Sequence, residues 1–172
     1  MSSLPLGKHA SGGPGTDRPP VPEPSFADRA RTLVYLGRIG SLSTLSRKQP
    51  GFPFGSVMPY ASDGHGRPIF LISTMAMHTH NLLADPRASL LVTLPDASGD
   101  PLGASRVTLL GDVSAIDKAE IAEARELYLA RYENSKHWVD YEDFSCFRME
   151  VVEVYSERLR VPGFTYRTAL QE

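Results

Sequence analysis

The chain has 172 residues, of which 41% are hydrophobic and 22% are charged, and its formal net charge at pH 7 is −2. This is the composition of an ordinary globular domain with one core, so wholesale disorder is excluded. No apolar run approaches the roughly 20 residues that a membrane-spanning helix needs, and the nearly balanced charge predicts neither a membrane nor a nucleic acid as a partner. The single cysteine, Cys146, and the lack of an apolar leader predict a cytoplasmic protein.

The first 24 residues differ from the rest of the chain. They include the run Gly12-Gly13-Pro14-Gly15 and four further prolines between positions 19 and 24, and they contain almost no large apolar side chains. Such a segment cannot bury enough surface to offset the entropy that it loses on ordering. We therefore predict a flexible tail over residues 1–24 and one folded domain over residues 25–172.

The folded domain begins with a predicted helix. Ser25 and Asp28 have the spacing of a capping box, and apolar side chains recur at helical spacing from Phe26 until Gly37. Beyond Gly40 the pattern changes to strands separated by glycine-bearing turns. We predict strands over residues 40–46, 55–62, 67–74, 88–94, 104–116, 144–154 and 157–161, and further helices over residues 77–84 and 117–132.

Short, mostly antiparallel strands of this kind favour a mainly β fold. A closed or nearly closed barrel with flanking helices is expected, because closure removes exposed strand edges. Pro59 interrupts the strand over residues 55–62 and removes one backbone N–H from any sheet ladder. That strand is therefore expected at an edge of the sheet.

A polar cluster joins the strand that ends near residue 74 to the following helix. Its donors are Ser73, Thr74, His78, Thr79 and His80. On a helix His78 and His80 point about 200° apart, so they cannot share one ion, and we predict no metal site. The N–H groups of a helix N-terminus and the neighbouring hydroxyls suit a phosphate. Simple capping by Ser73 or Thr74 is the competing interpretation, and it fits the cluster better when the cluster is taken alone.

A second feature favours the phosphate interpretation. Arg47 and Lys48 precede a Pro/Gly turn that leads into a strand containing Ser56, Val57 and Met58. Each cation alone is typical of a solvated turn. Together with the hydroxyl-rich helix start they form a candidate clamp for a dianionic phosphate.

The segment from Gly37 to Val92 carries three blocks, PFGSVMPY, LIST and HTHNLLADPRASLLV, in this order and spacing. With them the chain resembles the FMN-binding split-barrel superfamily of pyridoxamine 5′-phosphate oxidase, and within it the haem-utilisation (HugZ-type) and CREG-like branch. The resemblance covers residues 26–161. It implies a six-stranded antiparallel split β-barrel that forms a homodimer, with FMN bound at the subunit interface.

The resemblance also assigns the cofactor-binding residues. Ser56, Val57 and Met58 would line the isoalloxazine, Ser73 and Thr74 would stand at the ribityl phosphate, and His78 and Thr79 at the phosphate itself. The oxidases have an Arg-Lys pair where this chain has His78 and Thr79. Near the C-terminus they have a Trp and an Arg, where this chain offers Tyr155 with Arg158 or Arg160, so oxidation of pyridoxamine 5′-phosphate itself is not expected.

Two classes of function follow from the resemblance. The first is an FMN-dependent oxidoreductase acting on a small molecule; because the flavin supplies the redox chemistry, no catalytic triad or carboxylate pair is required. The alternative is a haem-binding (HugZ-type) or CREG-like non-catalytic module, with His78, His80 or His137 as candidate iron ligands. Trp138 is interpreted as a packing residue at the subunit interface, with His137 exposed beside it.

Overall fold

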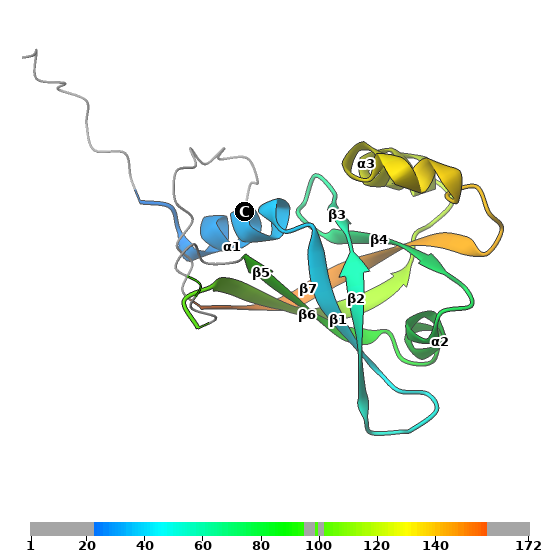
Figure 1. Ribbon diagram of the computed structural model, residues 1–172, viewed down its shortest axis with the longest axis horizontal. Helices are drawn as coiled ribbons and strands as arrows, with labels where there is room; N and C mark the ends of the chain where they lie inside the picture. The colour runs from blue at the N-terminus through cyan, green and yellow to red at the C-terminus, as the bar shows by residue number, and fades with distance from the viewer. Residues whose placement is uncertain (1–22, 95–98, 100–101, 158–172) are drawn as a thin grey trace, which may run out of the picture.

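The computed structural model describes residues 23–94, 99 and 102–157. Within these ranges seven antiparallel strands form one curled sheet, in the order β2-β1-β5-β6-β7-β4-β3, with helices packed around it (Figure 1). The strands are β1 (Ile39–Leu45), β2 (Pro53–Pro59), β3 (Ala61–Ser62), β4 (Pro68–Ser73), β5 (Arg87–Leu94), β6 (Ser105–Ala115) and β7 (Phe144–Glu157). The helices are α1 (Phe26–Leu36), α2 (Met77–Ala84), α3 (Ile121–Arg131) and the short 3-10 helix η1 (Glu133–His137).

The predicted fold class is confirmed, because the chain is mainly β and its curled antiparallel sheet with flanking helices is that of a split barrel. The family resemblance implies six strands, and the seventh is the two-residue β3, which pairs with the start of β4. β2 lies at an edge of the sheet, as Pro59 predicts. Of the tail predicted over residues 1–24, residues 1–22 lie outside the described residues, while Glu23 and Pro24 contact Arg29 of α1.

Two element boundaries differ from the prediction. β7 is one continuous strand as far as residue 157, where separate strands over 144–154 and 157–161 are predicted, because β6 supplies backbone partners along its length. Positions 158–161 lie outside the described residues. α3 begins at Ile121 rather than at residue 117, because the N–H of Glu120 donates to the carbonyl of Asp117 and closes a separate turn first.

The interior of the barrel is an apolar cluster to which the sheet and two helices contribute. α1 starts at a complete capping box: the N–H of Asp28 donates to Ser25 Oγ over 3.1 Å, and the N–H of Ser25 donates to the Asp28 carboxylate over 3.2 Å. The helix then turns one face inward, and α2 contributes Leu82. The buried side chains of α1 are Ala30, Leu33 and Val34.

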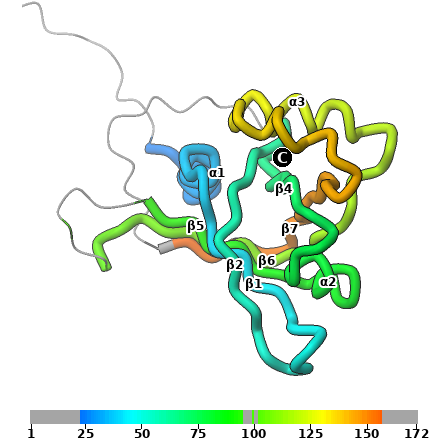
Figure 2. The backbone as a smooth tube through the Cα atoms, turned by 45° about the vertical axis from the view of Figure 1, so that its right-hand side comes forward, coloured from blue at the N-terminus to red at the C-terminus, as the bar shows by residue number. Residues whose placement is uncertain are grey.

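α3 runs alongside the β4–β7 part of the sheet (Figure 2), and a second apolar cluster lies between them. α3 contributes Ala124 and Tyr128, and the strands contribute Leu71 and Cys146, which are paired across β4 and β7. Burial raises the pKa of the Cys146 thiol, so this thiol is protonated at neutral pH. The cysteine therefore acts as a small apolar side chain beneath the helix.

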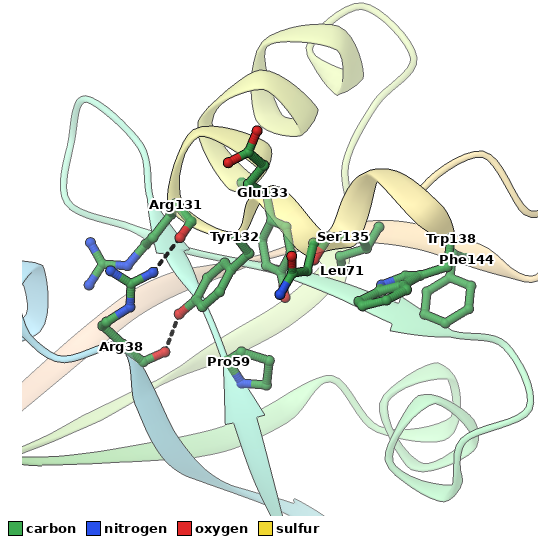
Figure 3. A pocket seen from close by; sticks show the side chains of 11 residues that line it. Arg38, Pro59, Leu71, Arg131, Tyr132, Glu133, Ser135, Trp138 and Phe144 are labelled. Atoms are coloured by element: carbon green, nitrogen blue, oxygen red, sulfur yellow. Dashed lines mark hydrogen bonds between the residues drawn. The ribbon is translucent and has the colours of Figure 1, made fainter.

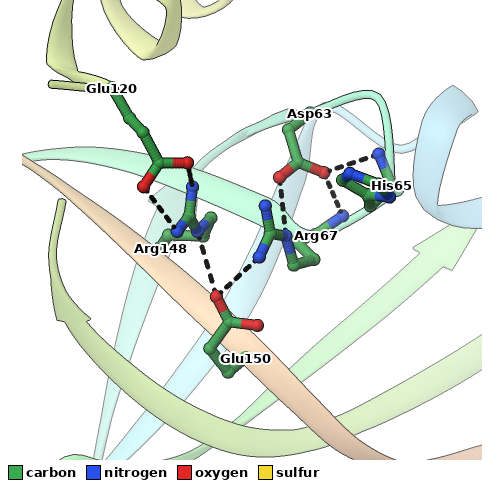
Figure 4. A network of polar contacts seen from close by, with 6 residues as sticks. All are labelled: Asp63, His65, Arg67, Glu120, Arg148 and Glu150. Atoms are coloured by element: carbon green, nitrogen blue, oxygen red, sulfur yellow. Dashed lines mark hydrogen bonds and ion pairs between the residues drawn. The ribbon is translucent and has the colours of Figure 1, made fainter. Parts of the chain in front are cut away.

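A network of charged side chains joins the start of α3 to the sheet (Figure 4). Arg148 donates to both carboxylate oxygens of Glu120, over 2.9 and 3.1 Å, and to Glu150 over 3.1 Å. Arg67 donates to Asp63 over 2.7 Å and to the same Glu150 over 2.8 Å. At an exposed surface, shared and bidentate contacts of this kind fix geometry more than they add stability. The network therefore holds the beginning of α3 against β7.

A β-bulge interrupts the pairing of β6 and β7 between Leu110 and Gly111. A Cβ atom at Gly111 would lie 2.2 Å from the carbonyl oxygen of Glu150 and 3.0 Å from the side chain of Met149. Glycine is thus required for the close approach of the two backbones. Because a bulge bends its strand, this position contributes to the curl of the whole sheet.

We expect Gly111→Ala to lower the free energy of unfolding by about 1–3 kcal/mol, because the backbone must move to accept the methyl group. Urea unfolding measures this change. Gly55→Ala is the matched control: a Cβ there would meet no atom within 4 Å, so a change within about 0.5 kcal/mol is expected. Equal losses in the two variants would contradict this account of the bulge.

Candidate functional site

The curl of the sheet brings β2, at one edge, against the start of α2, which follows β4 near the other edge (Figure 1). The contact is a 3.3 Å approach of His78 Nδ1 to Ser56 Oγ. The structure thus brings together one residue predicted beside a flavin ring and one predicted beside its phosphate. Space is open over the adjacent Gly55, where an added Cβ would meet no atom within 4 Å.

Two of the three hydroxyl groups predicted to hold a phosphate, those of Ser73 and Thr79, are engaged within the protein. Ser73 Oγ donates to the Asp143 carboxylate over 3.1 Å and accepts the N–H of Met75 over 3.2 Å. Thr79 is 1% exposed and donates its hydroxyl to the carbonyl of Ser73 over 2.6 Å. The N–H of Thr74 donates to the carbonyl of Asp143 over 2.6 Å. These bonds hold the start of α2 against the start of β7.

The capping interpretation of this cluster is wrong. The residue at the N-cap of α2 is Ala76, and no side chain caps the helix. Within the described part of the chain, the N–H groups of Met77 and His78 have no hydrogen-bond acceptor. They are the unpaired first-turn donors that every α-helix leaves.

His78 is half buried. Burial lowers the pKa of its imidazole below the ordinary value of 6.5, because the charged form loses solvation. The ring is therefore mostly neutral at pH 7. A neutral imidazole is a good metal ligand but brings no positive charge to a phosphate.

Arg47 and Lys48 are exposed in the turn between β1 and β2. The turn is held by Asn81 of α2, which is fully buried, accepts the N–H of Arg47 over 2.9 Å and donates to Thr44 Oγ1 over 2.9 Å. The two cations therefore lie beside α2. Neither has an ion-pair partner among the described residues.

The other residues singled out from the sequence lie apart from this contact. Val57 and Met58 point to opposite faces of β2: Val57 is 76% exposed, and Met58 is buried in the barrel interior. His80 is partly exposed, and His137 is exposed. The His137 ring lies next to Trp138, with 6.4 Å between the ring centroids.

A cleft of about 640 Å³ opens between β2, β4 and the segment that follows α3 (Figure 3). Pro59 of β2 and Leu71 of β4 form its strand side, and the rings of Tyr132, Trp138 and Phe144 line it from the other elements. Figure 3 shows Trp138 and Phe144 together at one end. The volume falls in the range of roughly 300–1,000 Å³ typical of small-molecule sites.

Arg38 and Arg131 lie at the opposite end of the cleft (Figure 3). Arg131 donates to the carbonyls of Tyr35 (2.7 Å) and Gly37 at the C-terminus of α1, and Arg38 donates to the carbonyl of Arg131 at the C-terminus of α3. Neither guanidinium has a carboxylate partner among the described residues. Glu133, which pairs with Lys136 over 3.1 Å, also lines the cleft, so the cleft carries two guanidinium groups and one carboxylate.

Tyr132 separates the two ends of the cleft. Its hydroxyl lies within hydrogen-bond distance of the carbonyls of Arg38 and Tyr60, the latter at 2.9 Å, and its one proton can be donated to either; it accepts the N–H of Tyr60 over 3.2 Å. The Arg38 guanidinium lies over its ring, 5.2 Å from the centroid. These contacts fix the ring between α3 and β2, so the cleft has a defined width.

The cleft and the polar cluster are neighbouring parts of one surface. Phe144, at the apolar end of the cleft, pairs with Ser73 in the β4–β7 ladder. The carbonyl of Ser73 in turn accepts the hydroxyl of Thr79, which follows His78 on α2. The predicted residues at the start of α2 thus lie just beyond the aromatic end of the cleft.

Sequence reasoning missed most of the cleft. Trp138 was the one lining residue that its aromatic character singled out, and Arg38 and Tyr132 carried no local signal. Arg38 and Tyr132 are joined by a hydrogen bond although 94 positions separate them in the sequence. Only the packing of α3 against β2 could have revealed the pairing, and α3 carries no motif that predicts where it docks.

Metal ligands and membrane-spanning segments were searched for in the same residues. In residues 23–94, 99 and 102–157, no three His, Cys, Asp or Glu side chains gather in a way that could hold a metal ion. None of the helices in these ranges is long and apolar enough to cross a membrane.

The fold and the cleft define a split-barrel protein with a candidate ligand site beside β2 and β4. The chain belongs to the CREG β-barrel family, whose model matches residues 22–157. This confirms the predicted branch of the superfamily.

Three relatives illustrate the family and its fold. The chain is 38% identical over 126 residues to the chloroplastic heme oxygenase HOZ of Arabidopsis thaliana, an alignment that covers 73% of this chain and 38% of that protein. A heme binding protein from Mycobacterium smegmatis has 38% identity and a TM-score of 0.75, over 80% of this chain and 56% of that one. A pyridoxamine 5′-phosphate oxidase-like structure from Listeria innocua, 17% identical over 78% of this chain and 99% of that one, shares the fold with a TM-score of 0.59. The chain thus spans well under two thirds of the plant and mycobacterial relatives.

We expect Asn81→Ala to destabilise the protein by about 1–3 kcal/mol, because it removes a buried amide that bonds both the N–H of Arg47 and the hydroxyl of Thr44. The same variant should speed hydrogen exchange at the N–H of Arg47, which hydrogen-exchange mass spectrometry can localise. Leu83→Ala, at an exposed position of the same helix, should leave both measurements nearly unchanged. Unaltered exchange in Asn81→Ala would show that the amide does not hold the turn.

Proposed function

We propose that this chain binds haem in the cleft between β2, β4 and the segment after α3. This was the alternative reading of the sequence, and two relatives support it: the plant protein is a heme oxygenase and the mycobacterial one a heme binding protein, each 38% identical to this chain. The observation that carries the proposal is the division of the cleft into an aromatic end and a doubly cationic end.

The residues of the cleft fit the chemistry of the group. Haem is a flat apolar ring with two carboxylates on one side, and it needs an axial ligand on its iron. Tyr132, Trp138 and Phe144 offer apolar surface to the ring, and Arg38 and Arg131 offer positive charge to the carboxylates. The Nε atom of Arg131 is buried and has no hydrogen-bond partner, so the cationic end is not fully satisfied by the protein itself.

His78 is the iron ligand that we propose. It is half buried, its lowered pKa keeps the imidazole neutral, and it stands on a helix just beyond the aromatic end of the cleft. Its contact with Ser56 occupies Nδ1 and leaves Nε2 for the iron. When bound, haem would supply the iron centre, and this chain would position it and shield one face from water.

We expect His78→Ala to weaken haem binding at least about tenfold, the effect of removing a bond worth at least 1.4 kcal/mol. Haem titration followed by the Soret absorption band measures this loss. His65→Ala removes an exposed imidazole from the β3–β4 turn and serves as the control, with unchanged affinity. Equal affinities in the two variants would reject the ligand assignment, and a wild-type protein without a Soret band would reject haem binding altogether.

The affinity of the wild-type protein for haem should also depend on pH. Protonation of the imidazole competes with iron for Nε2, and burial places the pKa of His78 below 6.5. Affinity should therefore be constant above neutrality and fall as the pH drops below 6.5. In His78→Ala the same titration should be flat over this interval, and an identical fall in that variant would assign the pH dependence to another group.

FMN-dependent oxidoreduction of a small molecule is the second candidate function. The approach of His78 to Ser56 and the open space over Gly55 favour it, because a flavin ring and its phosphate would meet these residues. The hydroxyls of Ser73 and Thr79, however, are already bonded within the protein. Haem is therefore the better supported ligand.

We further propose that the chain acts as a homodimer that pairs through the outer face of its sheet. Paired residues of adjacent antiparallel strands share a face, and one such row runs across β2, β1, β5, β6 and β7. It comprises Val57, Ser41, Leu91, Thr108 and Tyr155, of which Val57, Leu91 and Tyr155 are 76%, 38% and 54% exposed. The helices that contact β5 and β6, α1 and α2, pack into the barrel interior instead. Three large apolar or aromatic side chains exposed along one row of an open sheet face are typical of an interface.

We expect Leu91→Asp to shift the protein from dimer to monomer, because a carboxylate in the middle of the row would be buried without a partner. Light scattering coupled to size exclusion gives the mass in solution. Leu83→Asp, an equal change at an exposed site on α2, should leave the dimer intact. A monomeric wild-type protein, or a dimer unaffected by Leu91→Asp, would reject this interface.

A further inference from the structure

Asp143 stands where the resemblance to flavoproteins places a phosphate. Its carboxylate lies 3.1 Å from Ser73 Oγ, and its carbonyl accepts the N–H of Thr74 over 2.6 Å. Among the described residues no cation pairs with it. A negative charge is therefore fixed at the end of β4, beside the two residues assigned to a ribityl phosphate.

Two hydroxyl donors near this carboxylate, those of Ser73 and Thr79, are committed to the protein. Ser73 has one hydroxyl proton and gives it to Asp143. Thr79 gives its proton to the carbonyl of Ser73 and is almost fully buried, so it could meet a ligand only by breaking that bond. A phosphate at this position could accept no hydrogen bond from these two hydroxyls, and it would face a carboxylate.

No fixed cation offsets the carboxylate at close range. Arg47 and Lys48 lie in the exposed turn beside α2, where water screens their charge. The first-turn N–H groups of α2 are the remaining attraction, and a helix N-terminus carries only about half a positive charge.

From this arrangement we infer that Asp143 is a specificity-determining residue. It excludes dianionic phosphate ligands such as FMN from the surface at Ser73 and His78. The cleft beside it, with cations at its far end, stays open to ligands whose acidic groups lie at that end. The inference concerns which ligands are rejected, so it stands or falls independently of haem binding.

Comparison of FMN with riboflavin tests the inference, because the two share the isoalloxazine and differ only by the phosphate. Asp143→Asn keeps an oxygen that can accept the Ser73 hydroxyl but removes the charge. We expect this variant to bind FMN at least about fivefold more tightly than the wild-type protein, while its affinity for riboflavin is unchanged, because the negative charge that repels the phosphate is removed. Flavin fluorescence during titration gives both constants.

Glu142→Gln is the matched control. It removes the same charge one position earlier, at an exposed side chain, and should leave the preference between FMN and riboflavin as it is in the wild-type protein. An Asp143→Asn variant that fails to bind FMN, or that gains equally for FMN and riboflavin, would overturn the inference. Haem titration of the same preparations reports separately on the proposed function.

The wild-type protein offers a second test that needs no variant. If Asp143 repels the phosphate, raising the salt concentration should screen the repulsion and strengthen FMN binding, with riboflavin unaffected. If Arg47 and Lys48 instead clamp the phosphate, added salt should weaken FMN binding. The latter result would overturn the inference.

Discussion

The hydroxyl of Tyr132 is the contact on which the shape of the candidate site depends. It bonds to the backbone on both sides of the barrel opening, at Arg38 before β1 and at Tyr60 after β2. The phenol of Tyr60, itself fully buried, then donates to the carbonyl of Val34 in α1 over 2.7 Å. Two phenols therefore connect α3, two strands and α1 in one chain of hydrogen bonds. A cleft between such elements has walls that cannot move independently.

The charge of the site follows from the same connection. Arg38 and Arg131 each donate to carbonyls at the end of a helix, where the partial charge is negative. Guanidinium groups can in this way be held at a partly buried position without a carboxylate, so their charge remains available to a ligand. At the other end of the surface the arrangement is reversed, because Asp143 adds negative charge and His78 adds none. One surface of the molecule thus carries positive charge near Arg38 and Arg131 and negative charge near Asp143.

The elements that could be predicted from the sequence are those with strong local signals. The capping box at Ser25 predicted the start of α1, and Pro59 predicted that β2 lies at an edge. The family could be predicted as well, because its blocks lie within one stretch of the chain. The cleft could not, since it is made where the end of α3 meets β2, and those residues are far apart in sequence. The role of Asp143 was hidden for the same reason: its partner Ser73 lies 70 positions earlier.

The chemical reactivity of Cys146 can report how often α3 separates from the sheet. The thiol lies beneath α3, at 2% exposure, and a protonated, covered thiol does not react with alkylating reagents. Modification can therefore proceed only while α3 is lifted from β4 and β7. The rate of labelling thus reports how often this opening occurs. α3 leads directly into the residues that line the cleft. Labelling of the native Cys146 therefore also reports how often this wall of the cleft moves away from the sheet.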